Sequence, residues 1–358
     1  MRIAQLRAEN FRLFAHLSLA PGAGLNFFTG ENAAGKSSLL EAVYCAARAK
    51  SFRAGHLAEM AGALGRHWRL AVQLQDARGL EEQIGLQWSA AEGLRMGSSQ
   101  EATLTTAALA ARMPTQILEP DLHRLVQEGP GQRRSFLDWG LFHVEPSFLP
   151  LWRRYQRALR QRNLALRNQR PTREIQVWDP ELVTQGEALH QLRQHYLEQL
   201  TPRFQAELAE LLPGAEARIE LSRGWPERAD LATALRQGLS RDLRLGSTGE
   251  GPHRMEFRVR LDGHQIKGRI SRGQQKLLIS ALLLAQATQI GEQGRGHPVL
   301  LVDDLTAELA QTYQARLLER FGRYPGQRFI TSFEPPAGLT RLPDLRLFHV
   351  EHGRVRQC

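Results

Sequence analysis

Between residues 30 and 37 the chain carries glycines, a lysine and a serine at a spacing that suits phosphate binding. The segment reads Gly30-x4-Gly35-Lys36-Ser37, the pattern of a phosphate-binding loop between a strand and a helix. Glycines let successive backbone N–H groups turn toward one anion, and the dipole of the following helix favours negative charge. Lys36 would reach the β- and γ-phosphates of ATP, and the Ser37 hydroxyl would ligate Mg²⁺. The expected nucleotide contacts are Gly30, Glu31, Asn32, Ala33, Ala34, Gly35, Lys36, Ser37 and Ser38.

Two adjacent acids, Asp303 and Asp304, follow the apolar run from Val299 to Val302. An acid at the end of a buried strand is the expected metal partner of a phosphate-binding loop. We expect Asp303 to hold Mg²⁺, directly or through water, and Asp304 to orient the attacking water as general base. Lys36 and Asp304 are the predicted catalytic residues. Taken alone, two such acids could equally begin a solvated turn.

A polar cluster opens an otherwise apolar helix-forming stretch, "SRGQQKLLISALLLAQA", at residues 271–287. A helix N-terminus presents backbone N–H groups, so this tip is a second candidate anion site. Because the phosphate loop already grips one triphosphate, we expect the tip to cap the nucleotide held by Lys36 of a second subunit. The result would be an ATP-dependent, head-to-head homodimer with an isologous interface. The expected contacts are Ser271, Arg272, Gly273, Gln274 and Gln275. The alternative is that Ser271 only caps its own helix.

These residues need a sheet that brings distant segments together. The apolar run Leu25–Thr29 predicts a buried strand, and Lys36–Ala49 has apolar residues at helical spacing. Most of the chain separates Lys36 from Asp303, so a large segment is inserted between elements that must meet at one phosphate. The predicted fold class is α/β, a nucleotide-binding ATPase lobe with mixed sheets and an inserted α-helical lobe.

The expected boundaries follow from where the pattern becomes helical. We expect residues 1–132 and 245–358 to form the ATP-binding lobe and residues 133–244 to form the inserted, mainly helical lobe. Alternating apolar and polar residues around Asp76–Gly79 and around Asp262-Gly263 predict two β-hairpins. The second hairpin is expected to return the chain to the sheet-bearing lobe.

The charge balance favours a polyanionic partner, with nucleic acid first. The chain has 47 Lys and Arg against 37 Asp and Glu, a formal net charge of +10 and a pI near 10.3, although a basic protein without such a partner would show the same balance. Only Lys36, Lys50, Lys267 and Lys276 are lysines. Against such a bias toward arginine, a retained lysine is expected to be held by geometry, because an ammonium is a compact point charge.

One predicted helix, residues 152–170, is dense in arginine. Trp152, Tyr155, Leu159, Leu164 and Leu166 lie roughly on one side, and seven arginines crowd the others. We interpret the arginines as a strip for phosphate backbones, with no base-reading pattern; the alternative is a solvated helix face. The seven are Arg153, Arg154, Arg157, Arg160, Arg162, Arg167 and Arg170, and the DNA contacts expected first are Arg153, Arg154, Arg157 and Arg160.

Several classes of protein are disfavoured by composition. Cys45 and Cys358 are the only cysteines, too few for a disulfide framework or a zinc site. No run of about 18 apolar residues predicts a membrane span, and the N-terminal segment has no signal-peptide core. We expect a cytoplasmic protein without a membrane partner.

The order of these motifs resembles the head domain of ABC-type and SMC-like ATPases, and further stretches are similar to the RecF family of DNA repair and replication proteins. Those stretches occur in the family's order and span nearly the whole chain: "ENFR" at 9–12, "KSFR" at 50–53, "GQRRSFLD" at 131–138, "GPHR" at 251–254 and the segment 271–287.

The resemblance implies an ATP-gated DNA-binding protein with weak, DNA-stimulated ATPase activity acting as a switch. It also implies binding to double-stranded DNA or single-strand/duplex junctions, help in loading recombinase at gaps, and partners of the RecO and RecR type. A transporter-coupled ATPase subunit or a small-molecule kinase are the alternatives. The arginine-rich lobe disfavours the first, and the second leaves residues 271–275 without a role.

Some positions depart from the family pattern. Ala310 stands where an aspartate usually helps to pair the two heads, and Met255 and Glu256 stand where two acids are expected. Where transporter ATPases have a histidine, this chain has Thr331 and Ser332. The first two departures bear on the strength of dimerisation, and the third predicts slow hydrolysis.

Overall fold

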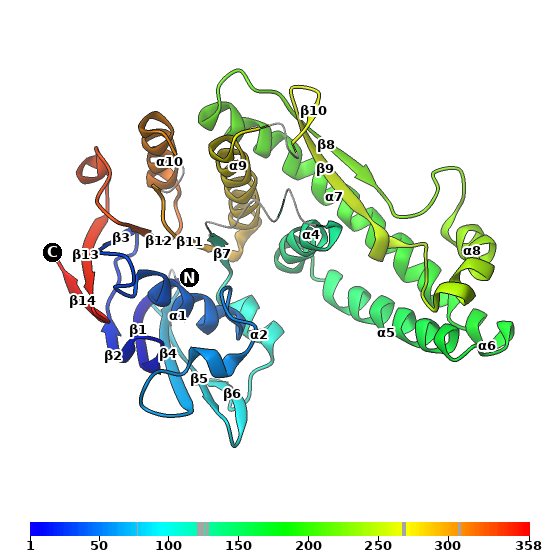
Figure 1. The fold of residues 1–358 in the computed structure, drawn as a ribbon, viewed down its shortest axis with the longest axis horizontal. Coiled ribbons are helices and arrows are strands. Elements are labelled where there is room, and N and C mark those ends of the chain that lie inside the picture. Colours follow the sequence, from blue (N-terminus) through cyan, green and yellow to red (C-terminus); the bar gives the residue numbers. More distant parts are fainter. Residues whose placement is uncertain (77, 120–124, 126–128, 267–269, 307–308) are drawn as a thin grey trace. The chain divides into compact units, whose positions relative to one another are not determined.

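The computed structural model spans residues 1–358 and describes all of them except 77, 120–124, 126–128, 267–269 and 307–308 (Figure 1). Lys267 is therefore outside the described residues. The chain forms two compact units: Met1–Leu122 with Arg272–Cys358, and His123–Ser271. The first unit is built from both ends of the chain, as expected. The second begins at 123 rather than 133 and also takes in residues 245–271, which we had assigned to the ATP-binding lobe.

The first unit contains a six-stranded sheet in the order β14-β13-β3-β12-β11-β7, parallel except for the edge strand β14. β3, β11 and β12 are buried along their whole length, as strands covered on both faces must be. The predicted strands at 25–29 and 299–302 are confirmed. The bounds are β3 Leu25–Thr29, β7 Thr115–Leu118, β11 Val299–Val302, β12 Arg328–Ser332, β13 Leu345–Glu351 and β14 Arg354–Gln357.

A second, antiparallel sheet of the same unit has the order β2-β1-β4-β5-β6. Its β4–β5 hairpin is the one predicted around Asp76–Gly79, where the N–H of Gly79 donates to the carbonyl of Asp76 at 3.2 Å. The bounds are β1 Arg2–Phe11, β2 Phe14–Leu19, β4 His67–Gln75, β5 Glu81–Ser89 and β6 Gly93–Ser98.

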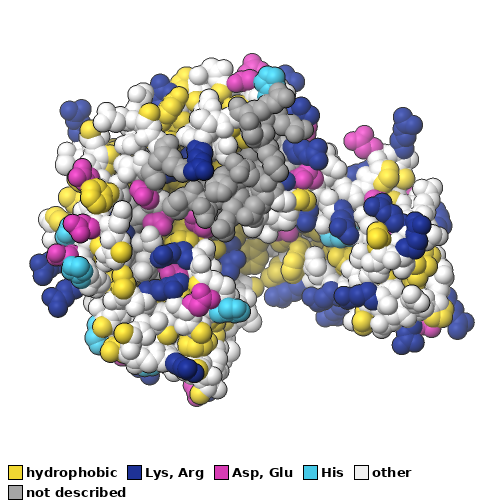
Figure 2. Space-filling model, in the orientation of Figure 1, with side chains coloured by type: hydrophobic (Ala, Val, Ile, Leu, Met, Phe, Trp, Pro, Cys, Tyr) yellow, Lys and Arg dark blue, Asp and Glu magenta, His cyan; other side chains and the backbone are white. Residues whose placement is uncertain are grey.

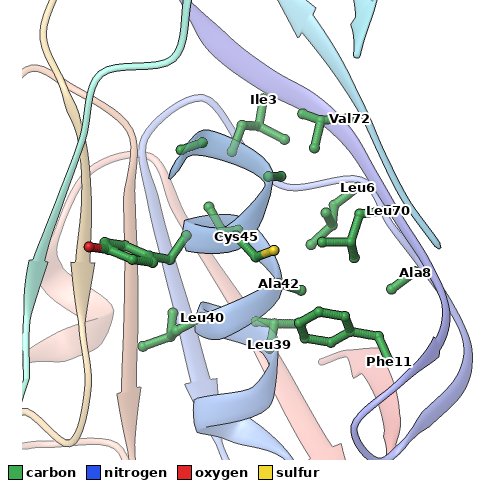
Figure 3. Close-up of a cluster of buried hydrophobic side chains, with 14 of the residues drawn as sticks. Ile3, Leu6, Ala8, Phe11, Leu39, Leu40, Ala42, Cys45, Leu70 and Val72 are labelled. Carbon is green, nitrogen blue, oxygen red and sulfur yellow. The ribbon is translucent and has the colours of Figure 1, made fainter. Parts of the chain in front are cut away.

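Helix α1, Lys36–Arg48, is buried along most of its length in the core of the first unit. Figure 3 shows Leu39, Ala42 and Cys45 on the side of α1 that faces β1 and β4. These side chains pack into the core between α1 and the sheet and hold the helix against it. The other helices among the described residues of this unit are η1 Leu57–Met60, α2 Thr106–Arg112, α9 Arg272–Ile290, η3 Gly291–Arg295, α10 Gln311–Arg323 and η4 Leu339–Arg341.

The second unit is mainly helical, as expected, but it also contains a three-stranded sheet in the order β10-β9-β8. The predicted hairpin at Asp262-Gly263 forms between β9 and β10, and β9 pairs with β8 of the same unit. The expectation that this hairpin returns the chain to the sheet-bearing lobe was wrong: residues up to 271 belong to the second unit, where Phe257 of β9 also packs on Phe136 of α4 with ring centroids 6.1 Å apart. The bounds are α4 Pro130–Val144, α5 Phe148–Arg167, α6 Thr172–Gln176, α7 Asp179–Leu211, β8 Ala217–Ser222, α8 Leu231–Leu245, η2 Pro252–Arg254, β9 Glu256–Leu261 and β10 His264–Gln265.

A buried polar network joins α5, α7 and α8 inside the second unit. Arg162 is fully buried; its Nε donates to Asp179 Oδ1 at 2.8 Å, and its Nη1 donates to Asp242 Oδ2 at 2.7 Å and to Thr248 Oγ1 at 2.9 Å. Our assignment of Arg162 to an exposed arginine strip was therefore wrong. Helical spacing alone could not reveal the two aspartates, which come from later segments.

The "GPHR" segment is tied into the same network. His253 Nε2 lies 3.0 Å from the carbonyl oxygen of Thr248, and His253 Nδ1 lies 2.7 Å from the hydroxyl of Tyr155. A carbonyl only accepts, so Nε2 carries the proton and Nδ1 accepts from Tyr155. The two departures that follow the motif are also held in the unit: Met255 is fully buried, and Glu256 pairs with Arg133 at 2.5 Å.

Among the described residues, no helix combines the length and the apolar content needed to cross a bilayer.

Candidate nucleotide-binding site

The loop between β3 and α1 has the backbone that the sequence predicts. Gly30 and Gly35 have φ values of +151° and +116°, which L-residues with a side chain rarely adopt. A Cβ on Gly30 would lie 2.2 Å from the carbonyl oxygen of Val350, so the neighbouring strand β13 also demands glycine there. The ammonium of Lys36 donates to the carbonyls of Gly30 at 2.6 Å and Glu31 at 2.8 Å. The loop therefore holds its lysine over its own backbone, at the N-terminus of α1.

A cavity of about 390 Å³ lies beside this loop, within the usual range of about 300–1,000 Å³ for ligand pockets. Residues of the loop and of α1, the two acids after β11 and two arginines from other segments meet in its wall. The lining residues are Arg12, Leu13, Asn32, Ala33, Gly35, Lys36, Ser37, Ser38, Arg53, Asp303, Asp304 and Thr331. The fold thus brings Lys36 and Asp303 together, as predicted.

The metal site expected at Ser37 and Asp303 has suitable donors. The Ser37 hydroxyl donates to Asp303 Oδ1 at 3.0 Å, and Asp303 is only 6% exposed. Hydroxyl and carboxylate oxygens are hard ligands of the kind Mg²⁺ prefers, and Mg²⁺ usually completes its shell with phosphate oxygens and water. The residues present therefore fit Mg²⁺.

Thr331, at the end of β12, contacts both acids. Its hydroxyl donates to Asp303 Oδ1 at 2.9 Å and accepts from the N–H of Asp304, also at 2.9 Å. The sequence drew attention to Thr331 only as a replacement for a histidine, and this contact was missed. The contact could have been predicted from a polar residue that closes an apolar run. β11 and β12 are parallel neighbours, so residues at the ends of the two strands lie close together.

Asp304 has a left-handed backbone, with φ of +50°. Its carboxylate accepts a long hydrogen bond of 3.4 Å from Thr306, whose hydroxyl lies 2.8 Å from that of Ser332. Burial lowers the pKa of Lys36, and the negative charges of Asp304 and Asp303 oppose that shift. Lys36 and Asp304 both line the cavity, which is the arrangement expected of an acid that orients water next to a phosphate.

The "ENFR" and "KSFR" segments build one wall of the cavity through Glu41 of α1. Glu41 is fully buried and accepts from Arg12 Nε at 2.8 Å and Arg12 Nη2 at 2.6 Å; this hydrogen bonding raises the pKa of Arg12. The Ser51 hydroxyl also donates to Glu41 and accepts from the N–H of Arg53 at 2.8 Å. Glu41 thereby fixes two segments that bring positive charge to the cavity. We missed this role because Glu41 sits within an otherwise apolar helix.

The signature residues 271–275 lie at the start of α9. Ser271 and Arg272 are exposed, Gly273 and Gln274 are half-buried, and Gln275 is 5% exposed. The described lining of the Lys36 cavity includes none of the five. Gln275 is buried, so its amide does not lie at the surface. This differs from the expectation that Gln275 is a surface donor.

The arginines of α5 differ in exposure, because Arg162 is buried and its neighbours are not. Arg153, Arg154, Arg157 and Arg160 are exposed, and Figure 2 shows Lys and Arg side chains gathered over this part of the second unit. Arg154 forms an ion pair with Glu181 at 2.8 Å, which offsets part of its charge. Arg153, Arg157 and Arg160 remain as a strip of positive charge.

Comparisons with known proteins agree with this geometry. Residues 2–339 match the RecF/RecN/SMC N terminal domain family. The DNA replication and repair protein RecF of Stenotrophomonas maltophilia is 43% identical, and that of Shewanella baltica is 35% identical, each over 99% of both chains.

Solved structures show the same fold. The recombination mediator protein RecF with ATP in the RecFOR pathway has a TM-score of 0.86 at 23% identity, covering 99% of this chain and 97% of that one. An Smc head bound to the C-winged helix domain of ScpA has a TM-score of 0.64 at 14% identity, covering 100% and 97%. These comparisons give no support to the two alternative functions, a transporter-coupled ATPase subunit and a small-molecule kinase. With two RecF relatives at this identity along their full length, the chain belongs to the RecF family of DNA replication and repair proteins.

Proposed function

We propose that this protein is an ATP-dependent DNA-binding switch: ATP joins two chains head to head on DNA, and slow hydrolysis releases them. The observation that carries the proposal is the meeting of Lys36, Ser37, Asp303 and Asp304 at one cavity, from segments almost at opposite ends of the sequence. The names of the RecF relatives, and ATP in the solved RecF structure, support the same assignment.

The residues of the cavity suggest how hydrolysis would proceed. The N–H groups of the loop and the Lys36 ammonium would bind the phosphates, and Arg12 and Arg53 would add positive charge. Ser37 and Asp303 would hold Mg²⁺, which would supply positive charge against that of the phosphates. Asp304 would orient water toward the γ-phosphate, with the Thr331 hydroxyl bonded to the Asp303 carboxylate and to the backbone N–H of Asp304. In-line phosphoryl transfer depends mainly on such positioning and charge.

The exposed part of the α9 tip would meet the triphosphate of the second chain. Each charge-assisted hydrogen bond from Ser271 or a neighbouring N–H contributes roughly 1.5–3 kcal/mol. Two equivalent sites would shift a weak monomer–dimer equilibrium by several powers of ten, at about 1.4 kcal/mol per decade. Stable dimers would therefore form only with ATP bound.

DNA would be bound by its phosphates rather than its bases. The net charge of +10 and the exposed arginines 153, 157 and 160 support this binding, with double-stranded DNA or a single-strand/duplex junction as the ligand. By analogy with its relatives, we propose that the protein acts in the cytoplasm with RecO- and RecR-type partners and helps to load recombinase at gaps.

Sedimentation with and without ATP tests the proposal. Wild-type protein should dimerise only with ATP, and Ser271→Ala should abolish dimers while leaving ATP binding intact. Lys36→Ala should lose nucleotide, and Asp304→Asn should bind ATP but remain dimeric because hydrolysis stops. Ser240→Ala, an exposed serine of α8, is the control and should behave as wild type. ATP-dependent dimers of Ser271→Ala, or normal turnover by Asp304→Asn, would contradict the assignment.

A further inference from the structure

Lys276 is a buried cation one turn into α9. It is 6% exposed, and the residues that follow it, Leu277, Leu278 and Ile279, are fully buried. An ammonium in such surroundings must be compensated by hydrogen bonds. Its Nζ donates to the carbonyl of Asp304 at 2.8 Å and to the carbonyl of Leu305 at 3.2 Å. The helix that carries the signature tip is thereby joined to the backbone of the predicted general base.

The same two peptide groups are held on their other side by β12. The N–H of Asp304 donates to the Thr331 hydroxyl and the N–H of Leu305 to the Thr331 carbonyl, each at 2.9 Å. The N–H groups of this turn are thus fixed by β12, and its carbonyls by α9. A left-handed non-glycine residue such as Asp304 persists only where its surroundings over-determine it. The two hydrogen bonds from Lys276 are the support that this turn receives from α9.

The geometry suits the transmission of a small movement. α9 is a continuous helix of 19 residues, so a shift at Arg272 or Gly273 would move Lys276 with it. A displacement of about 1 Å at a catalytic group can lower a rate about 100-fold. The position of the Asp304 carboxylate therefore depends on where the tip of its own helix is held.

We propose that Lys276 is a positioning residue that couples the α9 tip to Asp304, so that nucleotide engaged by the tip in one subunit sets the general base of that same chain. The inference rests on the proposed function, because the tip must bind the nucleotide of a second subunit. Each site then hydrolyses its own ATP well only when the other site is also filled. Turnover is accordingly cooperative in ATP.

Lys276→Met in the full chain tests this coupling, since methionine keeps the length of the stem and removes the donor. Steady-state ATPase should show kcat lowered about 10- to 100-fold, with KM within about twofold of wild type and a Hill coefficient below the wild-type value. ATP binding and ATP-dependent sedimentation as a dimer should be unchanged. A purely structural lysine would lower kcat and ATP affinity together.

Ser280→Ala is the matched control. Ser280 is fully buried on the same helix, and its hydroxyl donates to the carbonyl of Lys276 at 2.7 Å rather than to the Asp304 turn. This variant should keep the wild-type kcat and cooperativity even if its urea midpoint falls. If Lys276→Met does not fold, Lys276→Gln, which retains a donor, should show a smaller loss of kcat in the same pattern.

The outcomes separate the two proposals. Wild-type kcat and cooperativity in Lys276→Met, or an equal loss in Ser280→Ala, would overturn the coupling and leave the switch intact. A wild-type protein that binds ATP but neither dimerises nor hydrolyses it would overturn the proposed function, and the coupling with it.

Discussion

His253 makes the stability of the second unit depend on pH in a way that can be calculated. Burial is the largest cause that lowers the pKa of His253, from its ordinary value of 6.5 to about 4, and the positive charges of Arg254, Arg134 and Arg162 lower it further. The hydrogen bond to Thr248 opposes this shift. Protonation would also place a proton on Nδ1, the atom that now accepts from Tyr155.

The sign and size of the effect follow from proton linkage. Between pH 6.5 and 4 the unfolded chain binds about one more proton at this position than the folded protein does. The free energy of unfolding therefore falls by about 1.4 kcal/mol for each pH unit as the solution is acidified through this range. The loss would total about 3.4 kcal/mol by pH 4, a large part of the stability of an ordinary domain.

Urea unfolding at several pH values, followed by tryptophan fluorescence, measures this effect. Four of the six tryptophans, Trp139, Trp152, Trp178 and Trp225, lie in the second unit. Burial raises the pKa of Asp138 and Asp179, which acts in the opposite sense, so the comparison needs a variant that changes only His253. His253→Gln keeps an acceptor and a donor but does not titrate. Equal pH slopes for the wild type and His253→Gln between pH 4 and 6.5 would refute the reasoning.

Three further predictions concern other parts of the molecule. Arg162→Met should lower the free energy of unfolding by about 3–5 kcal/mol, because it leaves Asp242 buried without its partner. The control, Arg160→Met at an exposed neighbouring position, should change that free energy by less than about 0.5 kcal/mol. Urea titration of the two variants measures the difference. Ala310→Asp should raise stability by about 1 kcal/mol, since Ala310 is the N-cap of α10 and provides no side-chain cap, and Ala310→Asn should do the same. Replacing Arg153, Arg157 and Arg160 by glutamine should weaken duplex binding and flatten the slope of log K against log salt by about 0.9 for each DNA phosphate that is no longer neutralised; an unchanged slope would remove α5 from the DNA surface.

The parts of the fold that the sequence predicted are those determined by local pattern. β3 and β11 have the predicted bounds because a strand buried on both faces appears as an apolar run closed by polar residues. The loop at Gly30–Ser37 was found because its glycines and lysine are needed at a fixed spacing. The discontinuous first unit followed from the distance along the chain between Lys36 and Asp303.

What the sequence could not predict depends on long-range partners. Hairpin residues around Asp262-Gly263 specify a turn but not the neighbouring strand, which turned out to be β8. Arg162 looked like its exposed neighbours because its partners, Asp179 and Asp242, come from α7 and α8. Glu41 and Thr331 acquire their roles only when the segments of Arg12 and Asp303 meet them in space. In each case a residue far away in the chain decides the function of the side chain.

Two of the four lysines, Lys36 and Lys276, show why an arginine would not serve in their place, whereas Lys50 is exposed. Lys36 donates to the carbonyls of Gly30 and Glu31, and Lys276 donates to those of Asp304 and Leu305. In both cases one ammonium lies between two successive carbonyls of a sharply turned backbone. A compact cation with three rotatable donors can satisfy both at once, whereas a planar guanidinium directs its donors in a fixed fork. Lys36→Arg and Lys276→Arg should therefore fail despite keeping the charge, the first in ATP binding and the second in kcat. Full activity in either variant would show that charge alone explains the retained lysine.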